Sequence, residues 1–131
     1  MYQQARILLI SPCPEDHQTF RAAVRSKEWE LKHATSWAEA RRLLRDLNFS
    51  AIVIEANLGD CHWRDVFSRL AELDPAGAPP IIVTSADADD RLWSEVLNLG
   101  GHNVLAKPFE QREVSWVLET IPRASEELAT A

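Results

Sequence analysis

The sequence predicts an α/β fold in which five parallel strands form a sheet that helices cover on both faces. Short apolar runs alternate with amphipathic segments from one end of the 131 residues to the other. Each apolar run is too short for a buried helix, and each is followed by apolar residues at helical spacing. Strands that alternate with helices in this way are typical of a doubly wound parallel sheet.

The strands are predicted from the apolar runs. Three of these runs are continuously apolar, which indicates strands that are buried on both faces. The run at 29–34 instead alternates between apolar and polar residues, which favours a less buried strand. The predicted strands cover residues 7–10, 29–34, 51–54, 81–84 and 103–105.

The helices are predicted from apolar spacing and from their end signals. Ser36 and Glu39 form a capping box, in which the serine accepts an early helical N–H and the glutamate reaches back. Gly100 and Gly101 supply a C-terminal stop for a helix over 89–99, which is expected to bury Leu92, Val96 and Leu99. The other helices are expected over about 15–27, after Ser36, around 66–73, and along a stripe from Val114 to Ile121.

Length and composition predict one domain over residues 1–122 and a short tail over 123–131. The net charge of −6 argues against a nucleic-acid or anionic-membrane surface, which would need a basic patch. No apolar stretch approaches the length of a membrane span, and the first residues do not resemble a signal peptide. Two cysteines without a secretion signal favour a reduced, cytoplasmic protein.

In a sheet of this kind the functional residues lie beyond the carboxyl ends of the strands. The predicted strands run into Ser11-Pro12, Glu55, Ser85 and Lys107. Glu55 is the most unusual of these residues, because it places a carboxylate directly at the end of a buried strand.

These strand ends resemble those of the receiver domains of bacterial two-component response regulators. Residues 6–10 (RILLI) are similar to the first strand of that family, and residues 80–86 (PIIVTSA) to its fourth. Pro14 falls where many receivers have a proline, and the Leu-Gly-Gly of 99–101 resembles the Leu-Gly-Ala that usually precedes their fifth strand. Lys107-Pro108-Phe109 is the most specific match. The resemblance covers residues 5–121 and implies a flavodoxin-like (βα)5 fold, a phosphorelay role and a cis Lys107–Pro108 bond.

The resemblance also implies roles for single residues. Receivers hold Mg²⁺ with an acidic pair after the first strand and are phosphorylated on an aspartate after the third. A hydroxyl residue and a lysine contact the phosphoryl group, and an aromatic residue reports the active state. In this chain the acidic pair falls on Ser11 and Pro12, the acceptor on Glu55, the phosphoryl contacts on Ser85 and Lys107, and the aromatic switch on Val104.

The replaced residues argue against ordinary phosphorylation. Mg²⁺ prefers carboxylate oxygens, whereas Ser11 offers one neutral hydroxyl and Pro12 offers no side-chain ligand. Glu15 and Asp16 follow in the sequence, but they are expected beyond a proline-bounded turn. Glu55 is one methylene longer than aspartate, which would misplace an acyl phosphate. We therefore expect Mg²⁺ binding to be absent or weak, no other cofactor and no enzymatic activity.

A fixed ion pair between Glu55 and Lys107, with Ser85 as a hydrogen-bond donor, is one interpretation of the remaining residues. The alternative is that Glu55 has drifted and pairs with Lys107 only because a buried charge needs a partner. Two other functions stay open. One is a receiver that is phosphorylated through an unconventional metal or acceptor, such as Glu55 or Asp60, and the other is a flavodoxin-like binder of a small ligand.

Five tryptophans are many for this length. Trp93, Leu97 and Trp116 are predicted beside or opposite the apolar stripes of the last two helices, which indicates an interface on the face of the fourth helix, fifth strand and fifth helix. The resemblance implies a histidine kinase, an output protein or a second copy as partner. Trp116 lying flat on its own helix is the alternative.

Two further groups of residues have weaker signals. Cys13 and Cys61 are expected at the same end of the sheet, and with His17 and Asp16 near the first loop they suggest a redox or metal site. Their spacing shows no metal-binding pattern, so free thiols are the simpler interpretation. His33 is expected to be structural.

Overall fold

A computed structural model describes residues 5–24, 28–59, 61–73 and 79–121 of the chain. Its strands are β1 (Ala5–Ile10), β2 (Trp29–Ala34), β3 (Ala51–Glu55), β4 (Ile81–Ser85) and β5 (Asn103–Ala106). They form one parallel sheet in the order β2-β1-β3-β4-β5. The predicted doubly wound fold is confirmed. The predicted tail over 123–131 lies outside the described residues.

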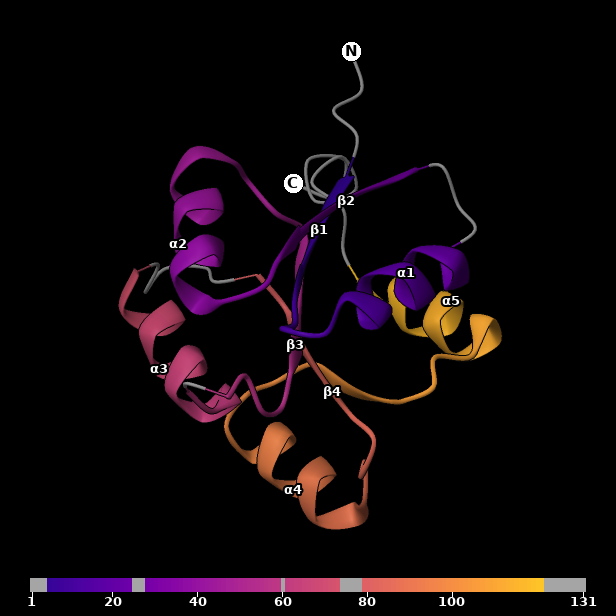
Figure 1. Cartoon of the computed structure of the whole chain (residues 1–131). Helices are drawn as coiled ribbons and strands as arrows, with labels where there is room; N and C mark the ends of the chain where they lie inside the picture. Colours follow the sequence, from indigo (N-terminus) through magenta and orange to yellow (C-terminus); the bar gives the residue numbers. More distant parts are fainter. Residues whose placement is uncertain (1–4, 25–27, 60, 74–78, 122–131) are drawn as a thin grey trace, which may run out of the picture.

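Within the described residues, five helices cover the sheet: α1 (Pro14–Ala23), α2 (Trp37–Asp46), α3 (Trp63–Leu73), α4 (Asp90–Asn98) and α5 (Gln111–Glu119). Figure 1 shows α2 and α3 on one side of the strands and α1 with α5 on the other. The first helix was predicted over about 15–27, but it ends at Ala23, where the N–H of Val24 closes the last turn on the carbonyl of Phe20. None of the described helices is long and apolar enough to cross a membrane.

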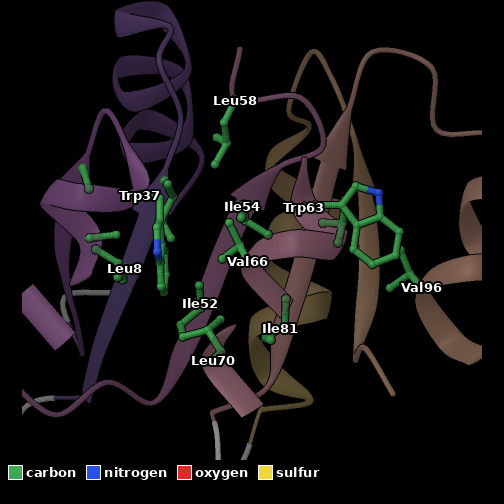
Figure 2. Packing of buried hydrophobic residues seen from close by; sticks show 14 of the residues in the cluster. Leu8, Trp37, Ile52, Ile54, Leu58, Trp63, Val66, Leu70, Ile81 and Val96 are labelled. Atoms are coloured by element: carbon green, nitrogen blue, oxygen red, sulfur yellow. The ribbon is translucent and has the colours of Figure 1, made fainter. Parts of the chain in front are cut away.

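The core consists of two clusters, one on each face of the sheet. Successive side chains of a strand point to opposite faces, so Leu8 and Ile10 join one cluster while Ile7 and Leu9 join the other. The first cluster lies under α2, α3 and α4, and Figure 2 shows Trp37 and Trp63 on either side of Ile54 within it. The second lies under α1 and α5. Both faces of β1, β3 and β4 are therefore buried, as their apolar runs predict.

Local signals fix the helix ends. The Ser36 side chain accepts a hydrogen bond from the Glu39 N–H at 3.2 Å, which opens α2, and Asp89 caps α4 in the same way. Gly100 adopts a φ of 95° just after α4, in the left-handed region that favours glycine. Leu99 was predicted to be buried, but it is about half exposed, because α4 ends before it and its side chain leaves the core stripe.

The strand order reverses between β1 and β3. The loops after these two strands lead to opposite faces of the sheet, which leaves a crevice at their carboxyl ends. Residues that end β1, β3, β4 and β5 are brought together at this edge of the sheet.

Candidate functional site: an ion-pair cluster at the strand ends

Lys107 is the centre of a charged cluster at the carboxyl edge of the sheet. It follows β5 directly, its N–H donates to the carbonyl of Ser85 at 3.0 Å, and its bond to Pro108 is cis. Its Nζ lies 2.8 Å from Glu55 Oε2 and 3.0 Å from Asp16 Oδ2. A third contact joins Nζ to Asp16 Oδ1 at 3.3 Å. One ammonium group therefore links three elements: α1, β3 and the end of β5.

Glu55 ends β3 and forms the ion pair with Lys107 that the sequence suggested. Its hydroxyl partner differs from the predicted one, because Thr84 Oγ1 donates to Glu55 Oε2 at 3.1 Å. Glu55 is aligned with Thr84 in the β3–β4 ladder, so these side chains leave the sheet on the same face. Ser85 points the other way, and its Oγ accepts the N–H of Asp87 at 3.0 Å. The prediction of Ser85 as the donor to Glu55 is therefore wrong.

Asp16 is the second carboxylate of the cluster, and the sequence reasoning placed it outside the site. It lies in the first turn of α1 and is only 7% exposed. Its Oδ2 also accepts a hydrogen bond from Ser11 Oγ at 2.6 Å. A signal was present in the sequence: Asp16 precedes Phe20 and Ala23 by four and seven residues, so it continues the stripe with which α1 faces the sheet.

The two positions after β1 differ in their environment. Ser11 is fully buried, its N–H donates to the carbonyl of Ala34, and its Oγ accepts the N–H of Cys13 while donating to Asp16. Pro12 is exposed. In place of an acidic pair, the end of β1 thus supplies one hydroxyl that orients the carboxylate from α1.

Burial by itself lowers the pKa of Lys107. The hydrogen bonds and negative charges of Glu55 and Asp16 outweigh that effect, so the pKa is raised above its ordinary value of 10.5. The side chains are 21% exposed for Lys107, 13% for Glu55 and 9% for Asp16. Because water reaches these groups poorly, their mutual attraction is screened less than that of a surface pair.

The donor set of this site does not fit a divalent metal ion as it stands. Two carboxylates are present, but both are directed at the ammonium of Lys107, and Ser11 Oγ donates its proton to one of them. An ion such as Mg²⁺ needs near-octahedral oxygen ligands and would have to displace the lysine from between the carboxylates.

The other predicted residues contribute no charged group to this cluster. Val104 is buried in the core on β5. Trp116 and Leu97 are more than half exposed, on α5 and α4, whereas Trp93 is half-buried against the core cluster. Cys13 and Cys61 are half-buried, and neither forms a disulfide. His33 is exposed on β2, and its ring contacts that of His17.

Comparisons with known proteins agree with this architecture. Residues 7–119 match the model of the response regulator receiver domain. Protein PetR of Rhodobacter capsulatus is 34% identical over 94 residues, which cover 72% of this chain and 38% of PetR. The chain thus spans about two fifths of the length of that curated relative.

Solved structures with the same fold are more distant in sequence. The chemotaxis response regulator CheY4 of Vibrio cholerae has a TM-score of 0.78 and 16% identity, over 89% of this chain and 98% of that one. The non-phosphorylated HemR receiver domain of Leptospira biflexa has a TM-score of 0.75 and 22% identity, over 91% of this chain and 97% of that one.

Proposed function

This chain belongs to the response regulator receiver domain family, and we propose that it is an atypical member that signals without ordinary phosphorylation, through contact with another protein. The family membership identifies it as a receiver domain of two-component signalling. The proposal concerns how this particular domain works. The observation that carries it is the engagement of Lys107 with both Asp16 and Glu55.

The proposal follows from what the lysine is already bound to. In the family, the lysine at this position contacts the phosphoryl group. Here its ammonium has two carboxylate partners at hydrogen-bond distance within the same domain. Charge-assisted bonds of this kind are stronger than neutral ones. An incoming phosphoryl group would therefore have to compete with two anions that the fold holds in place.

The acceptor position adds a second argument. Glu55 carries its carboxylate one methylene further out than aspartate, and Thr84 and Lys107 already bind its Oε2. Phosphoryl transfer depends on positioning and on a metal ion that neutralises developing charge. Neither the donor set nor the position of the acceptor supports that chemistry.

Asp16 is the one observation that favours the alternative function, a receiver phosphorylated by an unconventional route. It brings a second carboxylate to the site, which could contribute a metal ligand. Its two oxygens, however, are bound to Lys107 and Ser11. The other acceptor that the sequence suggested, Asp60, lies outside the described residues.

Incubation with acetyl phosphate and Mg²⁺, followed by intact-mass spectrometry, tests the proposal. We expect no phosphate adduct on the wild-type protein. Glu55→Gln is the matched control, because an adduct present in the wild type and absent in this variant would be assigned to Glu55. A stable adduct of that kind would contradict the proposal and support the alternative function.

We further propose that the contact surface surrounds the edge strand β5. Leu97 and Trp116 lie on the helices that flank this strand and Leu99 lies just after α4, and each of the three is about half exposed or more. Large exposed aromatics are frequent at binding hot spots. The partner would be a histidine kinase, an output protein or a second copy of the chain, in the cytoplasm.

A further inference from the structure

A pair of histidines lies outside the ion-pair cluster and has no role in the function proposed above. His17 is on α1 and His33 is on the edge strand β2. Their ring centroids are 4.6 Å apart, with the ring planes inclined by 50°. Two segments of the chain therefore bring an exposed and a half-buried imidazole ring into contact.

One nitrogen of His17 is already fixed. Its Nε2 lies 2.9 Å from the carbonyl oxygen of Ser11, which can only accept a hydrogen bond, so Nε2 carries the proton in the neutral ring. The remaining nitrogen, Nδ1, is then a lone-pair donor. It is buried and has no hydrogen-bond partner in the part of the chain that the structure describes. An unpaired buried nitrogen of this kind calls for an explanation.

We propose that His17 and His33 together bind a late first-row transition metal ion such as Zn²⁺ or Ni²⁺. Metal-binding histidines almost always donate their other N–H to a carboxylate or a backbone carbonyl, as His17 does to Ser11. Neutral imidazole is a preferred ligand of these ions.

The separation of the rings fits this role. An ion about 2.0–2.1 Å from one nitrogen of each ring places the two centroids about 4.5 Å apart at a right-angle ligand angle and about 5.2 Å apart at a tetrahedral one. The observed 4.6 Å falls within that range. His33 is exposed, so its ring can turn to admit the ion and share it with His17 Nδ1.

The site is an open one with two protein ligands. No group of three or more His, Cys, Asp or Glu side chains within the described ranges is arranged to hold a metal ion. Water would complete the coordination, as it does at metal sites that keep an open position. The ion would link the start of α1 to the edge strand β2. It would lie close to Asp16, which directly precedes His17 in the sequence.

Isothermal titration calorimetry with Zn²⁺ and Ni²⁺ tests the site on the intact chain. We expect one ion per chain and, in His33→Gln, a loss of affinity on the order of tenfold or more. His33 is exposed, so this variant keeps the fold. His62→Gln is the matched control, because His62 lies beside Cys61 on another loop and should leave binding unchanged.

A spectroscopic measurement on the wild type makes the test independent of any variant. Nitrogen-15 NMR of the imidazole rings should show Nδ1 of His17 shifting on addition of Zn²⁺ while Nε2 remains protonated. The proposal is overturned if no ion binds at millimolar concentration. It is equally overturned if His33→Gln binds the ion as tightly as the wild type does.

Discussion

At the scale of single residues, the decisive feature is a lysine that is shared by two carboxylates. Lys107 contacts Asp16 and Glu55 in a poorly hydrated site. The desolvation of three charged groups costs free energy, and only their close approach offsets it. Removing the lysine would leave two partly buried carboxylates without their common counter-ion.

We therefore expect Lys107→Met to lower the free energy of unfolding by about 2–4 kcal/mol, somewhat less than for a fully buried pair because some water reaches the site. Urea denaturation would measure this change. Lys32→Met is the matched control, since Lys32 pairs with Glu30 at the surface and should change stability by only about 0–1 kcal/mol. Equal effects of the two substitutions would show that the ion pairs of Lys107 contribute no more to the free energy of unfolding than a surface ion pair does.

At the scale of elements, the order of the strands and helices could be predicted from the sequence alone. Apolar runs and helical stripes report burial, and burial decides which segments form the layers of this fold. The pair of Glu55 and Lys107 could be predicted because both residues end strands that must meet at one edge of the sheet.

The details of that edge could not be predicted in the same way. The choice between Thr84 and Ser85 depends on the register of β3 against β4, and a shift of one residue exchanges the two faces. Asp16 was missed because its charge outweighed its place in the apolar stripe of α1. Leu99 was misplaced because one residue at a helix end decides whether a side chain faces the core.

The interface prediction belongs to the same scale. Trp116→Ala should weaken self-association or partner binding by at least tenfold, as loss of a binding hot spot does, while the melting temperature stays the same because the side chain is exposed. Sedimentation velocity measures self-association into a homodimer, and pull-down with purified candidate kinases measures binding to a partner protein.

Leu73→Ala provides the control for this experiment. Leu73 is similarly exposed, at the end of α3, which is not one of the two helices that flank β5. Binding that is unchanged in Trp116→Ala, or that is weakened equally in both variants, would contradict the proposed contact surface around β5.

At the scale of the whole molecule, the raised pKa of Lys107 makes stability depend on alkaline pH. A pKa that is higher in the folded than in the unfolded chain contributes stability below the unfolded value, and this contribution is lost as the pH rises through the folded value. The stabilising effect of Lys107 should thus be constant up to about pH 10, near its ordinary pKa, and decline above it.

Denaturation of the wild type and Lys107→Met between pH 8 and pH 11.5 would measure this dependence. The difference between their free energies of unfolding should stay level and then shrink above pH 10.5. A difference that instead grows as the pH rises toward 10.5 would mean that burial, rather than the two carboxylates, dominates the pKa of the lysine.

The two-sided core has a consequence for how unfolding of this domain can be observed. Trp29 belongs to the cluster under α1 and α5, whereas Trp37 and Trp63 belong to the cluster under α2, α3 and α4. Indole emission depends on its surroundings, so variants that keep only one of these residues and lack the other four tryptophans would make each face of the sheet visible separately in fluorescence. Coincident transitions from the two faces are what a single cooperative unit requires. The unusual number of tryptophans thus supplies built-in optical reporters for both halves of the domain.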